Sequence, residues 1–114
     1  MTTELYALKI RSYLKEASRH RSLKDFYAAG IFYQRAARTA YQAKKSPRRY
    51  ENMAIACFEK QAENSLSKEN FSQAADAIEH IAKIHEQNGD TKTAADLRLQ
   101  ASYLRLRGIE TLMA

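Results

Sequence analysis

Three histidines and one cysteine are the side chains of this sequence whose chemistry suits metal binding or catalysis. His80 and His85 are five residues apart, which places them about 140° apart around a helix, so they do not bind one metal ion from a single helix. Glu79 and Glu86 do not complete the HExxH pattern of metalloproteases. His20 stands among basic residues, which would repel a cation. We therefore expect no metal site and interpret His85 as a partly buried packing residue.

Cys57, the single cysteine, has no base close to it in the sequence, and we expect it to be a buried apolar residue. A single cysteine excludes an internal disulfide and fits a reducing, cytoplasmic compartment. No glycine-rich phosphate loop is present. Neither Arg11 nor Arg19 has the spacing from His20 that a helical ribonuclease-type site needs on one helical face. We therefore predict no catalytic residue, no cofactor and a protein that is not an enzyme; a catalytic helical bundle stays open as a third hypothesis.

Basic side chains are the strongest candidates for a function. Residues 1–50 hold 12 Lys and Arg but 3 Asp and Glu, whereas residues 51–114 hold 7 and 10. A chain polarised in this way directs its basic half at an acidic partner, although a solvated charged surface would look the same. The candidate partner-binding residues are Arg35, Arg38, Lys44, Lys45, Arg48, Arg49 and the adjacent Tyr50, joined by Arg19, Arg21 and Lys24.

These candidates form two groups at the two ends of one predicted helix, about 30 Å apart at 1.5 Å per residue. A surface of that length suits an acidic helix, a nucleic-acid backbone or an anionic membrane surface. Tyrosines and phenylalanines can also stack on bases, but most of them here fall on apolar helical stripes and are expected in the core. Tyr27 and Tyr50 fall off the stripes, and we expect them to be exposed.

The composition predicts an all-α fold in one domain of residues 1–114. Gly and Pro are few, at 3 and 1 residues, and good helix formers dominate. Apolar spacing predicts five helices at about residues 3–19, 23–45, 47–66, 71–87 and 91–107. Short turns between them favour antiparallel packing of successive helices. No apolar run approaches the roughly 20 residues of a membrane span, and the charged N-terminus does not read as a secretory signal.

The second predicted helix carries an apolar stripe that alternates large and small residues. Its members are Phe26, Ala29, Gly30, Tyr33, Ala36, Ala37, Ala40 and Tyr41. Small residues on such a stripe allow a close approach by a neighbouring helix, which is our explanation for Gly30. At the other end of the chain, Gly108 is expected to stop or fray the last helix and leave a short apolar tail of Ile109, Leu112 and Met113.

An internal repeat emerges when three polar turns are aligned. Each turn has an acidic or amide residue followed by a small residue, a residue four positions later and another three positions after that. The copies are Lys24-Asp25-Phe26 with Ala29, Tyr33 and Ala36; Glu69-Asn70-Phe71 with Ala74, Ile78 and Ile81; and Gly89-Asp90-Thr91 with Ala94, Arg98 and Ala101.

This pattern, over about residues 10–106, resembles the tetratricopeptide-like (TPR-like) family of helical hairpin repeats. The long helices with Ala and Tyr stripes are also similar to the arrays of soluble NSF attachment proteins. The aligned turns are 45 and 20 residues apart, whereas the regular repeat has about 34. The resemblance implies a protein-binding scaffold. One subfamily clamps acidic peptide C-termini with Lys, Asn and Arg, but the matching positions here hold Ser18, Ser65 and His85, so we do not transfer that clamp.

Our leading hypothesis is a five-helix, TPR-like adaptor that binds an acidic protein or peptide through its basic N-terminal half. A small basic nucleic-acid-binding protein is the alternative. Because the ends of a helical repeat array need covering, we also expect self-association through the last helix together with Ile109, Leu112 and Met113.

Overall fold

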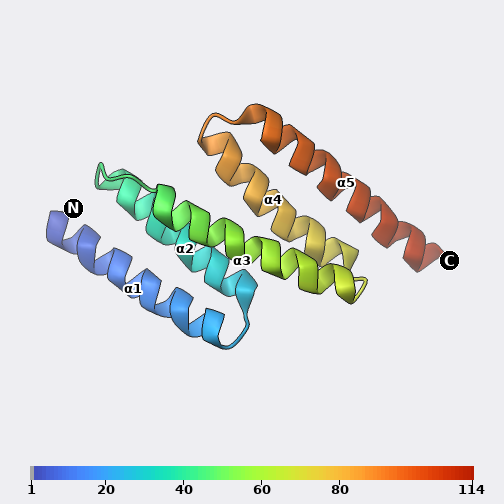
Figure 1. The fold of residues 1–114 in the computed structure, drawn as a ribbon, viewed down its shortest axis with the longest axis horizontal. Helices are drawn as coiled ribbons and strands as arrows, with labels where there is room; N and C mark the ends of the chain where they lie inside the picture. Colours follow the sequence, from blue (N-terminus) through green and yellow to red (C-terminus); the bar gives the residue numbers. More distant parts are fainter. Residues whose placement is uncertain (1) are drawn as a thin grey trace. The chain divides into compact units, whose positions relative to one another are not determined.

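The structure, a computed structural model, describes residues 2–114. This described chain consists of five α-helices and contains no β-strand. The helices are α1 (Thr3–Ser22), α2 (Phe26–Gln42), α3 (Arg48–Ser67), α4 (Phe71–Gln87) and α5 (Thr91–Met113) (Figure 1). The predicted all-helical class and the five helices are confirmed, whereas the TPR-like arrangement stays a prediction.

Two compact units divide the chain, residues 1–57 and residues 58–114. The N-terminal unit holds α1, α2 and the first half of α3. The C-terminal unit holds the second half of α3, α4 and α5. The expectation of one domain over residues 1–114 stays a prediction.

In the N-terminal unit, α1 and α2 pack side by side and run in opposite directions (Figure 1). Ile10, Ala36 and Ala40 form a buried cluster. The predicted α2 stripe is buried at Ala29, Gly30, Tyr33, Ala36, Ala37 and Ala40. Tyr41 was predicted on the same stripe, but it is 75% exposed, because it lies at the edge of the stripe in the last turn of α2.

In the C-terminal unit, α4 and α5 form the second side-by-side, oppositely directed pair (Figure 1). The buried face of α4 consists of Phe71, Ala74, Ala75, Ala77, Ile78, Ile81, Ala82 and Ile84, and it includes the stripe that helical spacing predicts from the sequence at Phe71, Ala74, Ala75, Ile78, Ile81 and Ala82. His85 is partly buried as expected, and α5 contributes Ala94 and Ala101. On α3, helical spacing places Leu66 on one apolar stripe with Ile55, Phe58 and Ala62, but Leu66 is 40% exposed.

The three aligned turns adopt one backbone conformation. Lys24, Glu69 and Gly89 have φ of 61°, 55° and 83°, which is the left-handed region. The next residues, Asp25, Asn70 and Asp90, have φ between −89° and −86° and ψ between 73° and 77°. Each turn therefore ends one helix and starts the next with the same geometry.

Hydrogen bonds explain why these turns need only three residues. The backbone N–H groups of Asp25, Asn70 and Asp90 donate back to the carbonyls of His20, Ser65 and His85, at 2.9, 2.8 and 2.9 Å. This contact completes a Schellman motif on the preceding helix. The side-chain oxygens of the same three residues accept from the backbone N–H of Ala28, Gln73 and Thr93, each at 3.2 Å. One residue thus closes a helix and caps the following one.

The turn between α2 and α3 shows what happens without such a cap. Lys44 is left-handed with φ of 59°, and the N–H of Lys45 donates to the carbonyl of Ala40 at 2.9 Å. Lys45 has no oxygen that can cap a helix, so the chain continues through Ser46 and Pro47 before α3 begins at Arg48. The predicted extension of α2 to Lys44 or Lys45 is therefore wrong.

Three other predicted helix ends also differ from the structure. α1 continues through Arg19 to Ser22, where a polar turn was expected, and α2 begins at Phe26 instead of at about residue 23. α5 does not stop at Gly108 but runs to Met113. Glycine inside a helix costs only about 1 kcal/mol relative to alanine, and Gly108 faces Phe71, whose Cβ would lie 3.6 Å from an added Cβ.

Candidate partner-binding surface

Six of the predicted partner-binding residues form what we call the basic surface of the N-terminal unit. All six side chains are exposed. Arg35 and Arg38 lie on α2, Lys44 and Lys45 in the turn that follows, and Arg48 and Arg49 in the first turn of α3. Chain connectivity alone places Arg38 and the last four residues at the same end of α2.

The basic surface has no acidic counterpart within its own segment. Residues 26–50 contain no Asp or Glu. Among residues 2–114, no ion pair involves any of the six basic side chains. The guanidinium of Arg35 lies over the ring of Phe32, 5.4 Å from its centroid, a contact that leaves its charge uncompensated. These positive charges are therefore available to a partner.

The other predicted group, Arg19, Arg21 and Lys24, lies at the opposite end of α2. The 17 residues of α2 separate the two groups by about 25 Å. Arg19 is already paired with Glu16, at 2.9 Å between Nη2 and Oε2. Arg19 and Arg21 stand in the last turn of α1, where a positive charge stabilises the helix dipole. The structure therefore does not bring this group together with the basic surface, and the site role of Arg19, Arg21 and Lys24 stays a prediction.

Three tyrosines differ in what they can offer a partner. Tyr50 was predicted to be exposed, but it is partly buried and packs with Tyr13 and Leu14 on the cluster around Ile10. Tyr27 is 37% exposed and Tyr41 is 75% exposed. Tyr27, Arg38 and Tyr41 lie within about 60° of one another around α2, so all three are on its outer face, with Tyr41 one turn from Arg38 and Tyr27 about 16 Å from it along the helix. The sequence analysis assigned Tyr41 to the apolar stripe and therefore missed it as an exposed residue. Its position three residues after the charged Arg38 could have indicated that it lies near the outer face.

Two arginines of the C-terminal unit, Arg98 and Arg105, are engaged with carboxylates. Arg98 Nη1 on α5 lies 2.6 Å from Glu86 Oε2 on α4. Arg105 bonds Asp76 at 3.0 Å and Glu79 at 2.8 Å. Hydrogen bonds that Arg98 donates to Glu86 raise the pKa of Arg98, and those that Arg105 donates to Glu79 and Asp76 raise the pKa of Arg105. These side chains join α4 to α5 and are not free to bind a partner.

The histidines and the cysteine take structural positions. His20 stacks on Phe32 at 5.4 Å, with Nδ1 3.3 Å from Asp25 Oδ2. His80 stacks on Phe58 at 4.7 Å, and burial lowers the pKa of its imidazole. Cys57 is buried, as predicted, and burial raises the pKa of its thiol despite the opposing charge of Arg21. Within the described residues, no three His, Cys, Asp or Glu side chains gather in a way that suits a metal ion.

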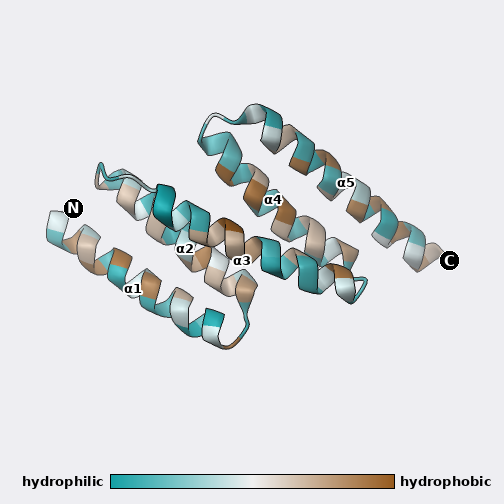
Figure 2. Ribbon diagram, in the orientation of Figure 1, coloured by the Kyte–Doolittle hydropathy of each residue, from teal (hydrophilic) through white to brown (hydrophobic). Residues whose placement is uncertain are grey.

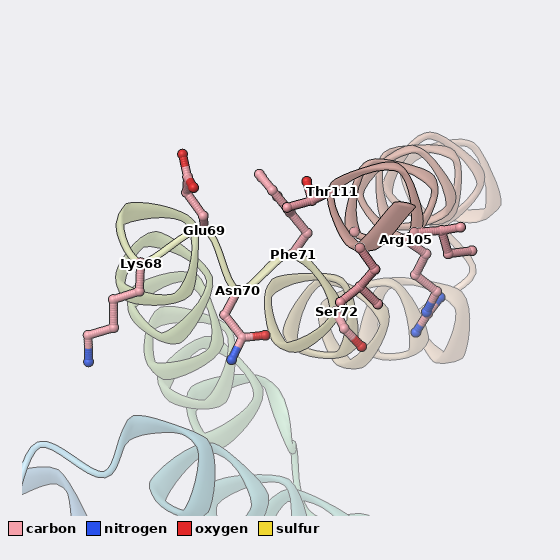
Figure 3. Close-up of a pocket in the computed structure, with 10 residues that line it drawn as sticks. Lys68, Glu69, Asn70, Phe71, Ser72, Arg105 and Thr111 are labelled. Carbon is pink, nitrogen blue, oxygen red and sulfur yellow. The ribbon is translucent and has the colours of Figure 1, made fainter. Parts of the chain in front are cut away.

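An open cleft of about 570 Å³ lies in the C-terminal unit. Figure 3 shows its lining side chains, which come from the turn after α3, the start of α4 and the end of α5. Ile109, Leu112 and Phe71 give it an apolar wall, and Arg105 and Asn70 contribute polar atoms. Arg105 and Asn70 are committed to an ion pair and a helix cap, and Lys68, Glu69 and Ser72 are the other charged or polar side chains that line the cleft with Thr111.

Comparisons of the chain with protein-family models, with curated proteins and with solved structures return no match. In the part of the chain that the structure describes, none of the helices has the length and apolar character needed to cross a bilayer.

Proposed function

We propose that this protein is a non-enzymatic adaptor that binds an acidic protein or peptide through the basic surface of its N-terminal unit. The observation that carries the proposal is a run of 25 residues, 26–50, without one carboxylate, in which six exposed basic side chains are left without an ion pair in the described structure. Burying an acidic partner segment against them would form charge-assisted hydrogen bonds without breaking an existing pair.

The identical turns support the scaffold part of the proposal. Helical hairpins that are joined by equivalent turns are the building blocks of repeat scaffolds. The three turns have a left-handed residue at the same position and an Asp or Asn cap after it, which is the kind of repetition that such an array requires. The TPR-like assignment of this chain and its role as an adaptor rest on this repetition and on the sequence pattern.

Nucleic acid is the second candidate partner because of the outer face of α2. Exposed Tyr41 lies one turn from Arg38 there, with Tyr27 farther along the same face, and an aromatic ring beside arginine favours base stacking with phosphate contact. The two candidates are separated by which probe binds more tightly at the same salt concentration.

The test is a binding titration with three labelled probes: a poly-glutamate peptide, a mixed-sequence single-stranded RNA and a duplex DNA. The binding variant changes Arg38, Arg48 and Arg49 to Glu, and it keeps Arg35 because that side chain packs on Phe32. The matched control changes the exposed lysines Lys60, Lys68 and Lys83 of the C-terminal unit to Glu, so that both variants have the same net charge.

We expect peptide binding that weakens at high salt, falls at least about tenfold in the binding variant and persists in the control. An equal loss in both variants would mean that only net charge matters and would contradict a specific surface. RNA or DNA binding that is tighter than peptide binding, with a steep salt dependence, would favour the second candidate. No binding of any probe at low salt would overturn the assignment of the basic surface.

A further inference from the structure

A second apolar face runs along α5, on the side that does not meet α4. Ala94 and Ala101 are 1% and 0% exposed and face inward. Leu106 follows Ala101 by five residues and therefore lies about 140° away around the helix. The outer row consists of Ala95, Leu99, Tyr103, Leu106 and Met113. Leu99, Tyr103, Leu106 and Met113 are 73%, 58%, 52% and 81% exposed, and Figure 2 shows apolar bands recurring along α5.

This outer row has the spacing of a helix-pairing seam. Leu99, Leu106 and Met113 are separated by seven residues, which returns to nearly the same side of a helix. A helix that is apolar on two faces is normally covered on both. Leu112 lies on the other side and lines the cleft beside Phe71, so it does not belong to this row.

The charges on the same side of α5 are arranged so that the helix complements itself. Lys92 and Glu110 are 18 residues apart, which is five full turns and therefore the same angular position. Asp96 and Arg107 are 11 residues apart, which leaves them within about 20° of each other. Along the chain the order is positive, negative, positive, negative. Two antiparallel copies would place Lys92 opposite Glu110 and Asp96 opposite Arg107.

The centre of this charge pattern lies at the centre of the N-terminal part of the apolar row, Ala95 to Leu106, while Met113 lies beyond the segment that would pair. Residue 101 is the midpoint of Lys92 and Glu110, and the apolar segment from Ala95 to Leu106 is centred within one residue of it. An antiparallel pair about this point also places Leu99 opposite Tyr103. A parallel pair in register would instead bring each charge against its own copy, which is repulsive.

These charges are accessible in the described structure. Lys92, Asp96 and Glu110 are exposed and take part in none of its ion pairs. Arg107 is exposed while its guanidinium lies over Phe71, 4.9 Å from the ring centroid, so it can turn toward a carboxylate without losing a salt bridge.

We propose that the outer face of α5 is a homodimer interface, in which two copies of this chain pair antiparallel about residue 101. The pairing buries Leu99, Tyr103 and Leu106 and forms two Lys92–Glu110 contacts. One helix face is smaller than the roughly 1,600 Å² of a standard interface. The dimer is therefore weak and dissociates at low protein concentration. The interface lies in the other unit from the basic surface, so either proposal can fail without the other.

The first test is molar mass by light scattering and sedimentation over a concentration series. We expect the wild-type chain to pass from monomer to dimer, and a Leu99→Glu, Leu106→Glu variant to stay monomeric. A matched control, Leu5→Glu with Leu8→Glu, changes two exposed leucines of α1, at 51% and 54% exposure, and should dimerise like the wild type. Circular dichroism verifies that each variant remains helical. The proposal is overturned if the wild-type chain is a monomer at every concentration. It is also overturned if the Leu99→Glu, Leu106→Glu variant still forms a dimer.

The second test is a charge swap that isolates the antiparallel register. Lys92→Glu and Glu110→Lys each place like charges opposite each other and should weaken dimerisation by about tenfold. The double variant restores opposite charges at both positions and should recover wild-type dimerisation. Failure of the double variant to recover, with the single variants weakened, would exclude this register.

Discussion

The two units use the same kind of helical hairpin but deploy their arginines in opposite ways. In the C-terminal unit, Arg98 and Arg105 are held by carboxylates of α4. In the N-terminal unit, Arg35 and Arg38 lie on α2, which carries no carboxylate, and they remain exposed and unpaired among the described residues. At these positions arginine therefore joins α4 to α5 in one unit and is presented to solvent on α2 in the other, whereas Arg19 pairs with Glu16 and Arg107 forms no ion pair among the described residues. The difference lies in the neighbouring helix and not in the arginine.

The cores of the two units differ in side-chain size. Buried apolar residues of the N-terminal unit are mostly alanines, with Ile10 and Tyr33 as the large members. The C-terminal unit also buries alanines, but beside them it buries five large apolar residues, Phe58, Phe71, Ile78, Ile81 and Ile84. A core of small residues is sensitive to added volume and a core of large residues to removed volume. The comparison therefore predicts which kind of substitution damages each unit.

The largest expected effect is a cavity in the C-terminal unit. Ile84 is 1% exposed, so Ile84→Ala should lower the free energy of unfolding by about 2–5 kcal/mol, as for other large-to-small core changes. Urea unfolding measures the change. Leu8→Ala, at 54% exposure, is the control and should cost much less; similar losses in both variants would contradict the assigned core.

The next effect is overpacking in the N-terminal unit. Ala36 is fully buried against Ile10 and Ala40, so Ala36→Leu has no room and should cost about 1–3 kcal/mol. Ala56→Leu adds the same volume at an exposed position of α3 and should be tolerated. Thermal unfolding of the two variants side by side decides the matter, and a stabilised Ala36→Leu would mean that the small-residue core is underpacked.

The equivalent turns predict that stability rises when glycine is introduced at the left-handed position and falls when glycine is removed from it. Lys24 and Glu69 occupy the left-handed position that Gly89 occupies in the third turn. Lys24→Gly and Glu69→Gly should each stabilise the fold by about 1 kcal/mol, because a side chain is disfavoured there. Gly89→Ala should destabilise it by a similar amount, and this loss would report on the backbone alone because nothing lies within 4 Å of an added Cβ. Urea unfolding with the same sign for all three variants would refute the equivalence of the turns.

A smaller effect separates the two uses of arginine. Arg105→Ala removes contacts to Asp76 and Glu79 and should cost about 1 kcal/mol, within the range of partly exposed ion pairs. Arg38→Ala breaks no ion pair and should leave the free energy of unfolding nearly unchanged. The difference should shrink at high salt. If both substitutions cost the same at low salt, the contrast between paired and available arginines is wrong.

The smallest effect is a pH dependence in the C-terminal unit. Burial first, and then Lys83, lowers the pKa of His80, while Asp76 and Glu79 oppose them. Folding therefore favours the neutral imidazole. The stability that this preference provides is complete above the unfolded pKa of about 6.5 and is lost as the pH falls through the folded pKa. His80→Phe keeps a ring to stack on Phe58 but cannot be protonated, so its stability should fall less between about pH 7 and pH 5. The measurement is the free energy of unfolding at several pH values for the wild type and for His80→Phe. If both lose the same stability between about pH 7 and pH 5, His80 is not the source of the pH dependence.

Local sequence signals account for most of the secondary structure. Asp25, Asn70 and Asp90 each supply a capping oxygen at the start of a helix, so the three short turns can be identified from the sequence. The prediction failed where the signal was weak. Lys44 and Lys45 looked suitable for the end of a helix, and no local rule shows that Lys44 takes a positive φ.

By itself, the amino-acid sequence determined the helical class, the buried stripes of α2 and α4, and the charge difference between the two halves, because these depend on composition and on periodicity along one helix. The tertiary structure decided which arginines are paired, that Tyr50 packs inward while Tyr41 is exposed, and that α5 continues through Gly108 with a second apolar face. Each of these depends on which side chains of another helix lie opposite, and spacing within one helix carries no information about its neighbours.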